Sequence, residues 1–407
     1  MPSRYAKLRR AELAALLPEL LLAGQLIDRS AMAWCIGAFG REGMTRVAIE
    51  EWMAASPVYT RRMQRALRYE GTDVVTIFKG LQLDIGAPPQ FMDFRFTVHD
   101  RWHGEFRLDH CGALADVEPL GDDYVTAMCH DIEDPTFDAT AVATNAKARV
   151  RPIHRPPRQP ADRHPCCAWT VVIDDTHPPV AESAGCRRLR KTRAAALDLD
   201  PIDPADDGAA DYAGPLRSDL DFAAFSKSAL VRLADEVCLQ MHLLNLGFVH
   251  AVHDRADPEQ AQAICRRQLI GIAGLSAGRL HRSLGLPGGT EGALRLLELH
   301  PLLNPAAYVR ATVGETVTVR PSPAHDDGAW ISLCGPHEPA PLRAIVRAVD
   351  PRLDVEVDGT AVEWTARLVR RDEPAKEFDE VAVTRISTGA SFEFRPRRSI
   401  PITPVRP

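Results

Sequence analysis

The chain lacks a long apolar run, and no stretch approaches the roughly 18 to 20 uncharged residues that a membrane helix needs. It also has no G-x-G-x-x-G loop and no phosphate loop ending in Lys-Ser/Thr. Basic runs are short and contain few interleaved aromatic residues. We therefore expect neither a membrane partner nor a nucleic-acid partner, and no nucleotide-binding motif is present.

The number of cysteines and the N-terminal residues indicate the expected cellular compartment. The nine cysteines are an odd number, which argues against a complete disulfide framework. A basic start (1–10) precedes an apolar segment (16–26), but Glu19 interrupts that segment and no small-residue cleavage site follows. We expect a cytoplasmic protein with reduced thiols. An excess of Arg over Lys, with many Ala, Pro and Asp residues, suggests a bacterial source.

Length and composition predict a globular protein of two or more domains. The chain has 407 residues, of which 45% are hydrophobic and 26% charged, with a net charge of −6. Leucines at i, i+3, i+4 spacing predict helices in residues 4–70, and the same spacing predicts helices again after residue 222. Residues 74–78, 91–98 and 167–173 are β-branched and aromatic and are predicted strands.

These patterns predict an α+β fold of two related halves, each a helical segment followed by a strand-rich α/β unit. The expected division is a helical segment (1–70), a Cys- and His-containing strand-rich unit (71–174), a linker (175–216), a second helical segment (217–290) and a degenerate strand-rich unit (291–398). The linker assignment depends on a composition rich in Asp, Pro, Ala and Gly without periodicity.

The two strand-rich units share landmarks. Each contains a strand-like run, a Cys-Gly pair (Cys111 and Cys334) and a closing aromatic segment. The separation from Cys111 to Trp169 is 58 residues, as is that from Cys334 to Phe392. A repeat near half the chain length fits duplication and fusion of a chain that once dimerised. Only the first copy contains further cysteines, so we expect the functional site in the first copy.

The first copy contains the residues expected to carry catalysis. Cys129, His130 and Asp131 are consecutive, and Cys111 ends a strand-like run. The thiolate is the reactive form of cysteine and needs a cationic or hydrogen-bonding neighbour. A Cys with His and Asp nearby is a minimal set for covalent attack on an electrophilic carbon. We predict that Cys129 or Cys111 attacks, His130 moves the proton and Asp131 orients His130.

Four further residues are predicted to bind substrate. Arg149 or Arg151 would receive a substrate carboxylate. Cys166 and Cys167 alternate faces in a strand, so at most one can point into the site, and we expect it to be Cys167. Trp169 follows on the same strand.

The order Cys-Gly, acidic connector, Met-Cys-His-Asp and a distal Cys before an aromatic strand resembles a known family. It is similar to the L-2-amino-thiazoline-4-carboxylic acid hydrolase family and, more distantly, to vinyl-4-reductase-type small-molecule-binding domains. The resemblance covers about residues 65–175 and is carried by short motifs: Cys111, Gly112, Glu118, Cys129, Asp131, Asn145 and residues 167–169.

The resemblance implies hydrolysis of a thiazoline ring C=N bond through cysteine, with Cys111 and Cys129 as the positions that would inherit such roles. This chain departs from the family in its duplicated second half and in a Pro-rich insertion at 152–165. The substrate is therefore not carried over.

Structural alternatives stand beside these roles. Cys111 can be a small buried hydrophobe, and its recurrence as Cys334 favours that alternative. Asp131 can belong to turn or helix-cap chemistry. His99 and His103 flank a predicted hairpin and are expected to be exposed turn residues.

Zinc is the main chemical competitor, with ligands drawn from the cysteines and His130. Structural zinc sites contain a close C-x₂-C pair, however, and the chain has none. No metal or cofactor is therefore expected.

The leading prediction is a cysteine-dependent hydrolase of a small C–N or C=N containing heterocycle or amide. The alternatives are a non-catalytic small-molecule-binding or sensor protein with structural cysteines, and a zinc-stabilised interaction scaffold. The partner is expected to be a small molecule. A homo-oligomer, the role of the second half and closure of residues 152–165 over a site are left open.

Overall fold

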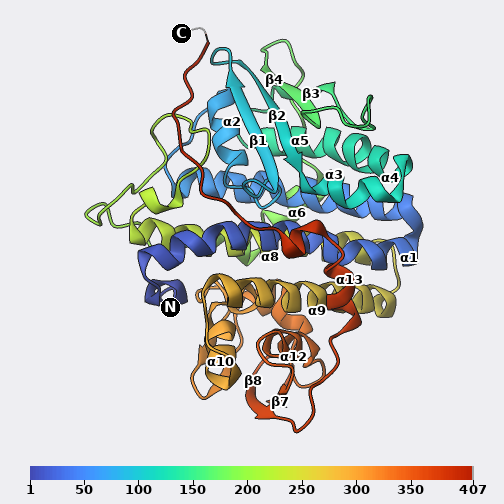
Figure 1. Ribbon diagram of the computed structural model, residues 1–407, viewed down its shortest axis with the longest axis vertical. Helices are drawn as coiled ribbons and strands as arrows, with labels where there is room; N and C mark the ends of the chain where they lie inside the picture. Colours follow the sequence, from blue (N-terminus) through green and yellow to red (C-terminus); the bar gives the residue numbers. More distant parts are fainter. Residues whose placement is uncertain (406–407) are drawn as a thin grey trace.

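Four helical arms form the middle layer of the molecule (Figure 1), in a computed structural model that describes residues 1–405. Helix α1 (Arg10–Ala66) folds back on itself at Gly40, whose φ of 69° and ψ of 177° break the helix. Glycine tolerates this positive φ because it has no Cβ. The two arms of α1 pack against α8 (Lys227–His253) and α9 (Pro258–Ser283).

An antiparallel four-stranded sheet lies on each side of this layer (Figure 1). The first sheet has the order β1-β2-β4-β3, built from β1 (Met92–Val98), β2 (His103–Cys111), β3 (Ala148–His154) and β4 (Cys167–Ile173). The second has the order β5-β6-β8-β7, built from β5 (Ala311–Val313), β6 (Thr316–Val319), β7 (Leu353–Gly359) and β8 (Trp364–Arg370). The repeated strand order confirms the predicted α+β fold of two related halves.

Shorter helices connect these elements. The first half adds α2 (Val74–Leu81), α3 (Gly112–Val117), α4 (Asp122–Thr126), the π-helical segment η3 (Ala127–Ile132) and α5 (Glu133–Ala141). The connection between halves contains α6 (Ala184–Leu189) and α7 (Arg193–Ala196). The second half adds α10 (Gly289–Leu299), α11 (Pro323–Asp326), α12 (Ala340–Arg347) and α13 (Asp379–Thr384). None of the helices in residues 1–405 is long and apolar enough to cross a membrane.

Two local expectations were wrong. Residues 74–78, predicted as a strand, begin α2, because the Asp73 side chain accepts from the Thr76 N–H and caps the helix. The segment 175–216 connects the two halves, and within it α6 packs on α1 and Cys186 is fully buried. Phe392 lies beyond β8, so the equal 58-residue spacings do not join equivalent positions.

The C-terminal segment joins the two halves. After α13 it runs across the helical layer to the first sheet (Figure 1), where the Val405 N–H donates to the Val98 carbonyl over 2.8 Å. On the way, the Ser387 hydroxyl and the Thr388 N–H donate to Asp116 of α3 over 2.6 and 2.7 Å. The second half therefore helps to position the first.

Candidate functional site

The inner face of the first sheet is apolar and packs on α2 and α5, whereas its outer face carries charged residues. Phe106, Leu108 and Trp169 alternate on the inner side and are at most 2% exposed. Arg149 and Arg151 alternate with buried Ala148 and Val150 on β3 and lie on the other side. The sheet thus separates the two predicted carboxylate-binding arginines from the buried cysteines.

Three of the predicted cysteines converge on one buried carboxyl group, that of Glu133. Cys111 ends β2, Cys129 lies in η3 and Cys167 begins β4. All three are at most 5% exposed, and Glu133 exerts the largest charge effect on each thiol. The structure therefore brings these three cysteines near one carboxyl group, Glu133, which was not among the predicted site residues.

The environment of these thiols favours the protonated form. Burial raises the pKa of Cys111, Cys129 and Cys167 above the ordinary thiol value, and the Glu133 charge raises it further. The N–H of Leu114 donates to Cys111 Sγ over 3.3 Å and opposes this shift without reversing it. In the resting structure none of the three is an activated thiolate.

The expected relay from Cys129 through His130 to Asp131 is not formed. Successive residues of a helical segment point in different directions, so the three side chains diverge. The His130 Nε2 lies 2.7 Å from the Pro156 carbonyl. Asp131 is exposed, and no hydrogen bond or ion pair joins it to His130 within residues 1–405.

The four predicted substrate-binding residues also have local partners. Arg151 pairs with Asp138 at 2.9 Å, and Arg149 donates to the carbonyls of Ala148 and Pro178. Trp169 is fully buried, and it packs 5.0 Å from the Phe137 ring, measured between ring centroids. Trp169 and Cys167 therefore belong to the wall behind the Glu133 region, and the two arginines stabilise the edge of the sheet.

A cavity of about 80 Å³ lies between the two arms of α1, the loop after α2, β1 and one face of η3 and α5. That face is formed by residues at helical spacing: Met128, Ile132, Glu133, Thr136, Phe137 and Thr140. The opposite wall comes from α1: Gln25, Asp28, Arg29, Trp52, Ser56 and Tyr59. The π-helical turn lies directly before Glu133, and such turns occur frequently at functional sites.

Three polar atoms in this lining have no hydrogen-bond partner in the part of the chain that the structure describes. They are Gln25 Oε1, Arg29 Nε and Glu133 Oε2. Their residues are 5%, 7% and 9% exposed. Buried polar atoms are nearly always paired, because a buried unpaired group costs about 1–3 kcal/mol. Three such atoms around one cavity are groups that a water molecule or a small polar ligand can satisfy.

Burial raises the pKa of two carboxyl groups near the cavity. Burial raises the pKa of Glu133 to about 8, although Arg155 lowers it in part. Burial and the neighbouring Asp28 raise the pKa of Glu51 well above its ordinary value. Arg29 pairs with Asp28 at 2.9 Å. The site therefore combines one ion pair with a carboxyl that exchanges its proton near physiological pH.

The polar groups on the remaining wall of the cavity already have hydrogen-bond partners within the protein. The Tyr59 hydroxyl and the Gly86 N–H each donate to Asp84 Oδ1 over 2.7 Å. Burial nevertheless raises the pKa of Asp84 to about 6. Gly24 allows this loop to approach α1, because a Cβ there would lie 2.5 Å from the Ile85 side chain. The wall is therefore preformed, and unpaired atoms are confined to the side of Gln25, Arg29 and Glu133.

The Pro-rich segment 155–165 covers the outside of η3. His130 contacts the Pro156 carbonyl, Arg155 pairs with Asp134, and Arg158 pairs with Glu118 at 2.8 Å. These contacts fix residues 155–158 against His130, Asp134 and Glu118, and none of the residues 152–165 lines the cavity.

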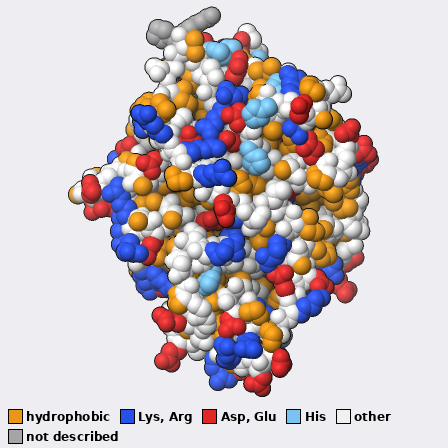
Figure 2. Space-filling view, in the orientation of Figure 1, with side chains coloured by type: hydrophobic (Ala, Val, Ile, Leu, Met, Phe, Trp, Pro, Cys, Tyr) orange, Lys and Arg blue, Asp and Glu red, His pale blue; other side chains and the backbone are white. Residues whose placement is uncertain are grey.

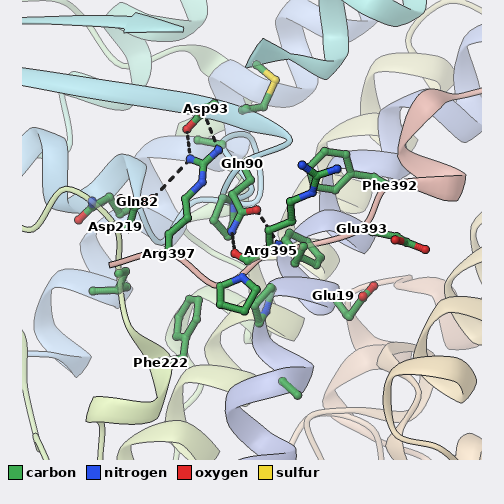
Figure 3. A pocket seen from close by; sticks show the side chains of 18 of the residues that line it. Glu19, Gln82, Gln90, Asp93, Asp219, Phe222, Phe392, Glu393, Arg395 and Arg397 are labelled. Carbon is green, nitrogen blue, oxygen red and sulfur yellow. Dashed lines mark hydrogen bonds and ion pairs between the residues drawn. The ribbon is translucent and has the colours of Figure 1, made fainter. Parts of the chain in front are cut away.

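A much larger cleft, about 1080 Å³, lies between the halves beside the C-terminal segment (Figure 3). Basic side chains gather across the middle of this face, interspersed with acidic ones (Figure 2). Arg397 pairs with Asp93 at 2.6 Å, and Arg279 pairs with Glu19 at 2.7 Å. Most of the charge in the cleft is therefore compensated within the chain, which makes the α1 cavity the stronger candidate.

The sequence did contain a signal for the residues that were missed. Asp28 and Arg29 directly follow an apolar stripe on the first arm of α1, and both are buried. Glu133 is four residues after Cys129, the spacing that places two side chains on one helix face. What the sequence did not show is the fold at Gly40, which brings the two arms of α1 around the cavity.

No protein-family model, no curated protein and no solved structure matches this chain.

Proposed function

We propose that the first half of the chain binds a small polar molecule in the α1 cavity, with Cys111, Cys129 and Cys167 as buried neighbours of its wall. The observation that carries this proposal is the group of three unpartnered polar atoms on Gln25, Arg29 and Glu133. Binding pockets combine an apolar lining with a few convergent polar groups, and perturbed pKa values are frequent in them. The α1 cavity has this composition.

The unpartnered atoms define the chemical class of the ligand. Gln25 offers an acceptor and Arg29 a donor, and a protonated Glu133 carboxyl both donates and accepts. The cavity of about 80 Å³ accepts only a few non-hydrogen atoms. A compact molecule with both donors and acceptors, such as a small amide, satisfies all three groups. Ordered water is the competing occupant, because water also satisfies buried polar groups.

Calorimetric titration of the full chain with acetamide, glycinamide and acetate tests the proposal. We expect saturable binding of at least one amide. Replacing the carboxyl by an apolar group of similar size, Glu133→Leu, should weaken it at least about tenfold, since each buried hydrogen bond lost costs about 1–3 kcal/mol. The control Glu42→Gln, an exposed position on α1, should not change affinity. Absence of saturable binding, together with water alone in a crystallised cavity, would contradict the proposal.

A second candidate function is hydrolysis of a C–N or C=N bond by a cysteine. It is favoured by the position of Glu133, the strongest charge acting on all three thiols, whose pKa is raised to about 8. When a C=N substrate is present, the thiol of Cys129 or Cys111 can pass its proton to the Glu133 carboxylate as sulfur adds to the carbon and the C=N π electrons move to nitrogen. Nitrogen then takes the proton from Glu133, and water adds to the same carbon as the C–S bond breaks and the cysteine thiol is restored. Glu133 then takes the role predicted for His130.

Chromatographic assay of L-2-amino-thiazoline-4-carboxylic acid consumption tests this second candidate. Under the hydrolase proposal, Cys129→Ala or Cys111→Ala abolishes consumption, and Glu133→Gln lowers it by about 100-fold or more. The control Cys265→Ala removes a buried thiol of α9 and should retain activity. If the wild-type chain consumes no substrate, the hydrolase proposal is contradicted. The binding proposal is tested separately, by the calorimetric titration.

A further inference from the structure

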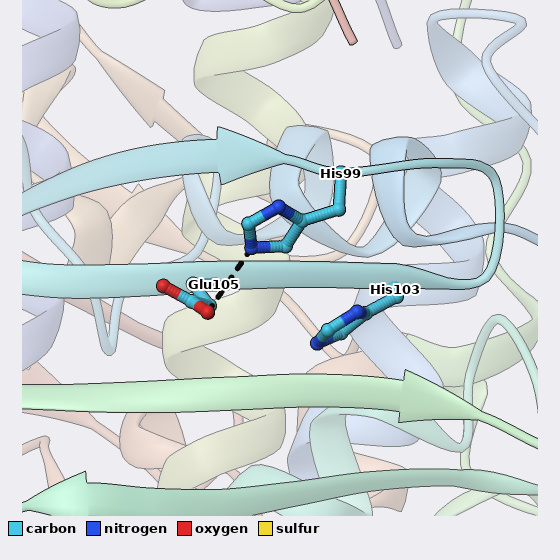
Figure 4. Close-up of side chains that lie close together, drawn as sticks. All are labelled: His99, His103 and Glu105. Carbon is cyan, nitrogen blue, oxygen red and sulfur yellow. Dashed lines mark ion pairs between the residues drawn. The ribbon is translucent and has the colours of Figure 1, made fainter. Parts of the chain in front are cut away.

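The hairpin between β1 and β2 brings two histidines and a glutamate together on the outer face of the first sheet (Figure 4). Thr97 pairs with Glu105 and Val98 with Gly104 in the strand register. The His99 N–H donates to the His103 carbonyl over 3.0 Å, so these two residues face each other across the hairpin. His103 and Glu105 are two residues apart on one strand and share a face.

The side chains converge as well as the backbone. His99 Nε2 lies 3.0 Å from Glu105 Oε1, and the rings of His99 and His103 are 4.7 Å apart between centroids. One ligand atom of each residue lies within 4.8 Å of the other two. Ligand atoms of a tetrahedral zinc ion lie roughly 3.3 Å apart, given metal–ligand distances of about 2.0–2.2 Å. A small rotation of His103 is therefore enough to complete the set.

The backbone beneath these side chains is held in place. Asp100 Oδ1 accepts from the N–H groups of Trp102 and His103 over 2.7 and 3.0 Å. Gly104 allows Phe78 of α2 to pack directly on the inner face, because a Cβ at Gly104 would lie 2.7 Å from the Phe78 ring. The hairpin is thus a preformed platform, which lowers the ordering cost of binding.

We propose that His99, His103 and Glu105 form a Zn²⁺ site. Two imidazoles and one carboxylate are a ligand set that zinc prefers over the hard cations Mg²⁺ and Ca²⁺. Three protein ligands leave a fourth position for water or a small anion. The three residues are half-buried, so that position faces solvent. This site lies on the opposite face of the sheet from the α1 cavity and is independent of the function proposed there.

Zinc titration of the full chain after treatment with chelator tests the site, with Zn²⁺ alone as the probe. We expect one Zn²⁺ per chain, followed by calorimetry, and a tetrahedral visible spectrum when Co²⁺ replaces it. His103→Ala and Glu105→Gln should each weaken binding by about 100-fold or more, because even second-shell changes cost 10- to 100-fold. The control His253→Ala removes an exposed histidine of α8 and should leave affinity unchanged.

Circular dichroism of each variant checks that it is folded, because substitutions at these surface positions should leave the spectrum of the folded chain unchanged. Two results would overturn the proposal: no stoichiometric zinc binding by the wild-type chain, or equal binding by folded His103→Ala and Glu105→Gln variants. An affinity lost in His253→Ala but not in His103→Ala would place the metal elsewhere and would also overturn it.

Discussion

Each half of the molecule buries a carboxylate near its sheet, and the two halves surround it differently. Asp354 of β7 is fully buried and contacts Arg343 at 2.8 Å, Arg347 at 2.9 Å and Arg371. Burial alone would raise the pKa of Asp354, but the Val355 N–H, Arg347 and Arg343 hold it below its ordinary value. Within residues 1–405 Glu133 has no paired arginine, and its pKa is raised to about 8.

The same strand order thus surrounds the buried carboxyl group differently in the two halves. In the second half the buried carboxylate of Asp354 is paired with arginines of the same chain. In the first half the unpaired carboxyl faces a cavity with two further unpaired atoms. Unsatisfied polar groups that persist in a packed interior indicate a site whose partner comes from outside the chain.

The largest effect is expected from breaking the saturated cluster. Asp354→Asn should lower the free energy of unfolding by about 3–5 kcal/mol, because it leaves three clustered guanidinium groups without their carboxylate. Denaturant unfolding measures the change. The matched control Glu356→Gln, on the same strand, removes an exposed ion pair with Arg367 and should cost less than about 1 kcal/mol. Equal, small changes in both variants would contradict the account.

Glu133→Gln should change the pH dependence of stability. The folded-state pKa of Glu133, about 8, lies above the ordinary value of 4.5, so the folded chain binds more protons between these values. The contribution of Glu133 to the free energy of unfolding is therefore highest at low pH and is lost as pH rises to about 8. The variant should match wild type near pH 5 and exceed it by a few kcal/mol at pH 9.

Parallel unfolding curves from pH 5 to pH 9 measure this difference. Glu42→Gln, an exposed substitution on α1, controls for the loss of a charge and should follow wild type at every pH. If Glu133→Gln shows the same slope as wild type, the carboxyl is paired in solution.

The Cys-Gly pair shared by the halves has a packing role in the first. A Cβ at Gly112 would lie 2.1 Å from the Phe91 ring, within a packed interior. Gly112→Ala should therefore cost about 1–3 kcal/mol by overpacking. Gly37→Ala, on a helix arm with open space around it, should be neutral or slightly stabilising. Similar thermal midpoints for both variants would show that the Phe91 contact relaxes freely.

The smallest effect is expected at the cysteines themselves. Cys129 and Cys334 are 2% and 4% exposed, and replacing either by Ala should cost about 1–2 kcal/mol through the lost sulfur contacts. Similar losses in the two halves support a packing role for Cys129. A cost confined to ligand binding or turnover, with stability unchanged, would favour the chemical role predicted from the sequence.

Sequence patterns predicted the architecture better than the site. Helical spacing and β-rich runs located helix in residues 4–70, helix again after residue 222 and the strand at residues 167–173, because these patterns report burial directly. Residues 74–78 were misassigned because the Asp73 cap outweighs β-branched composition. The Cys129–His130–Asp131 relay was not found because adjacency in sequence gives divergence on a helical segment. The spacing of Cys129 and Glu133 places them on one helix face, but the cavity beside Glu133 depends on the break in α1 at Gly40, which the sequence patterns did not show.

The most direct test of the account is the titration of the Glu133 carboxyl. Carbon-13 NMR of the labelled chain, with the resonance assigned by its absence in Glu133→Gln, follows the protonation of this group alone. We predict a midpoint near 8, as expected for a buried carboxyl without a protein partner. A midpoint near 4.5, the ordinary value, would show a solvated or paired carboxylate and would contradict the proposed site.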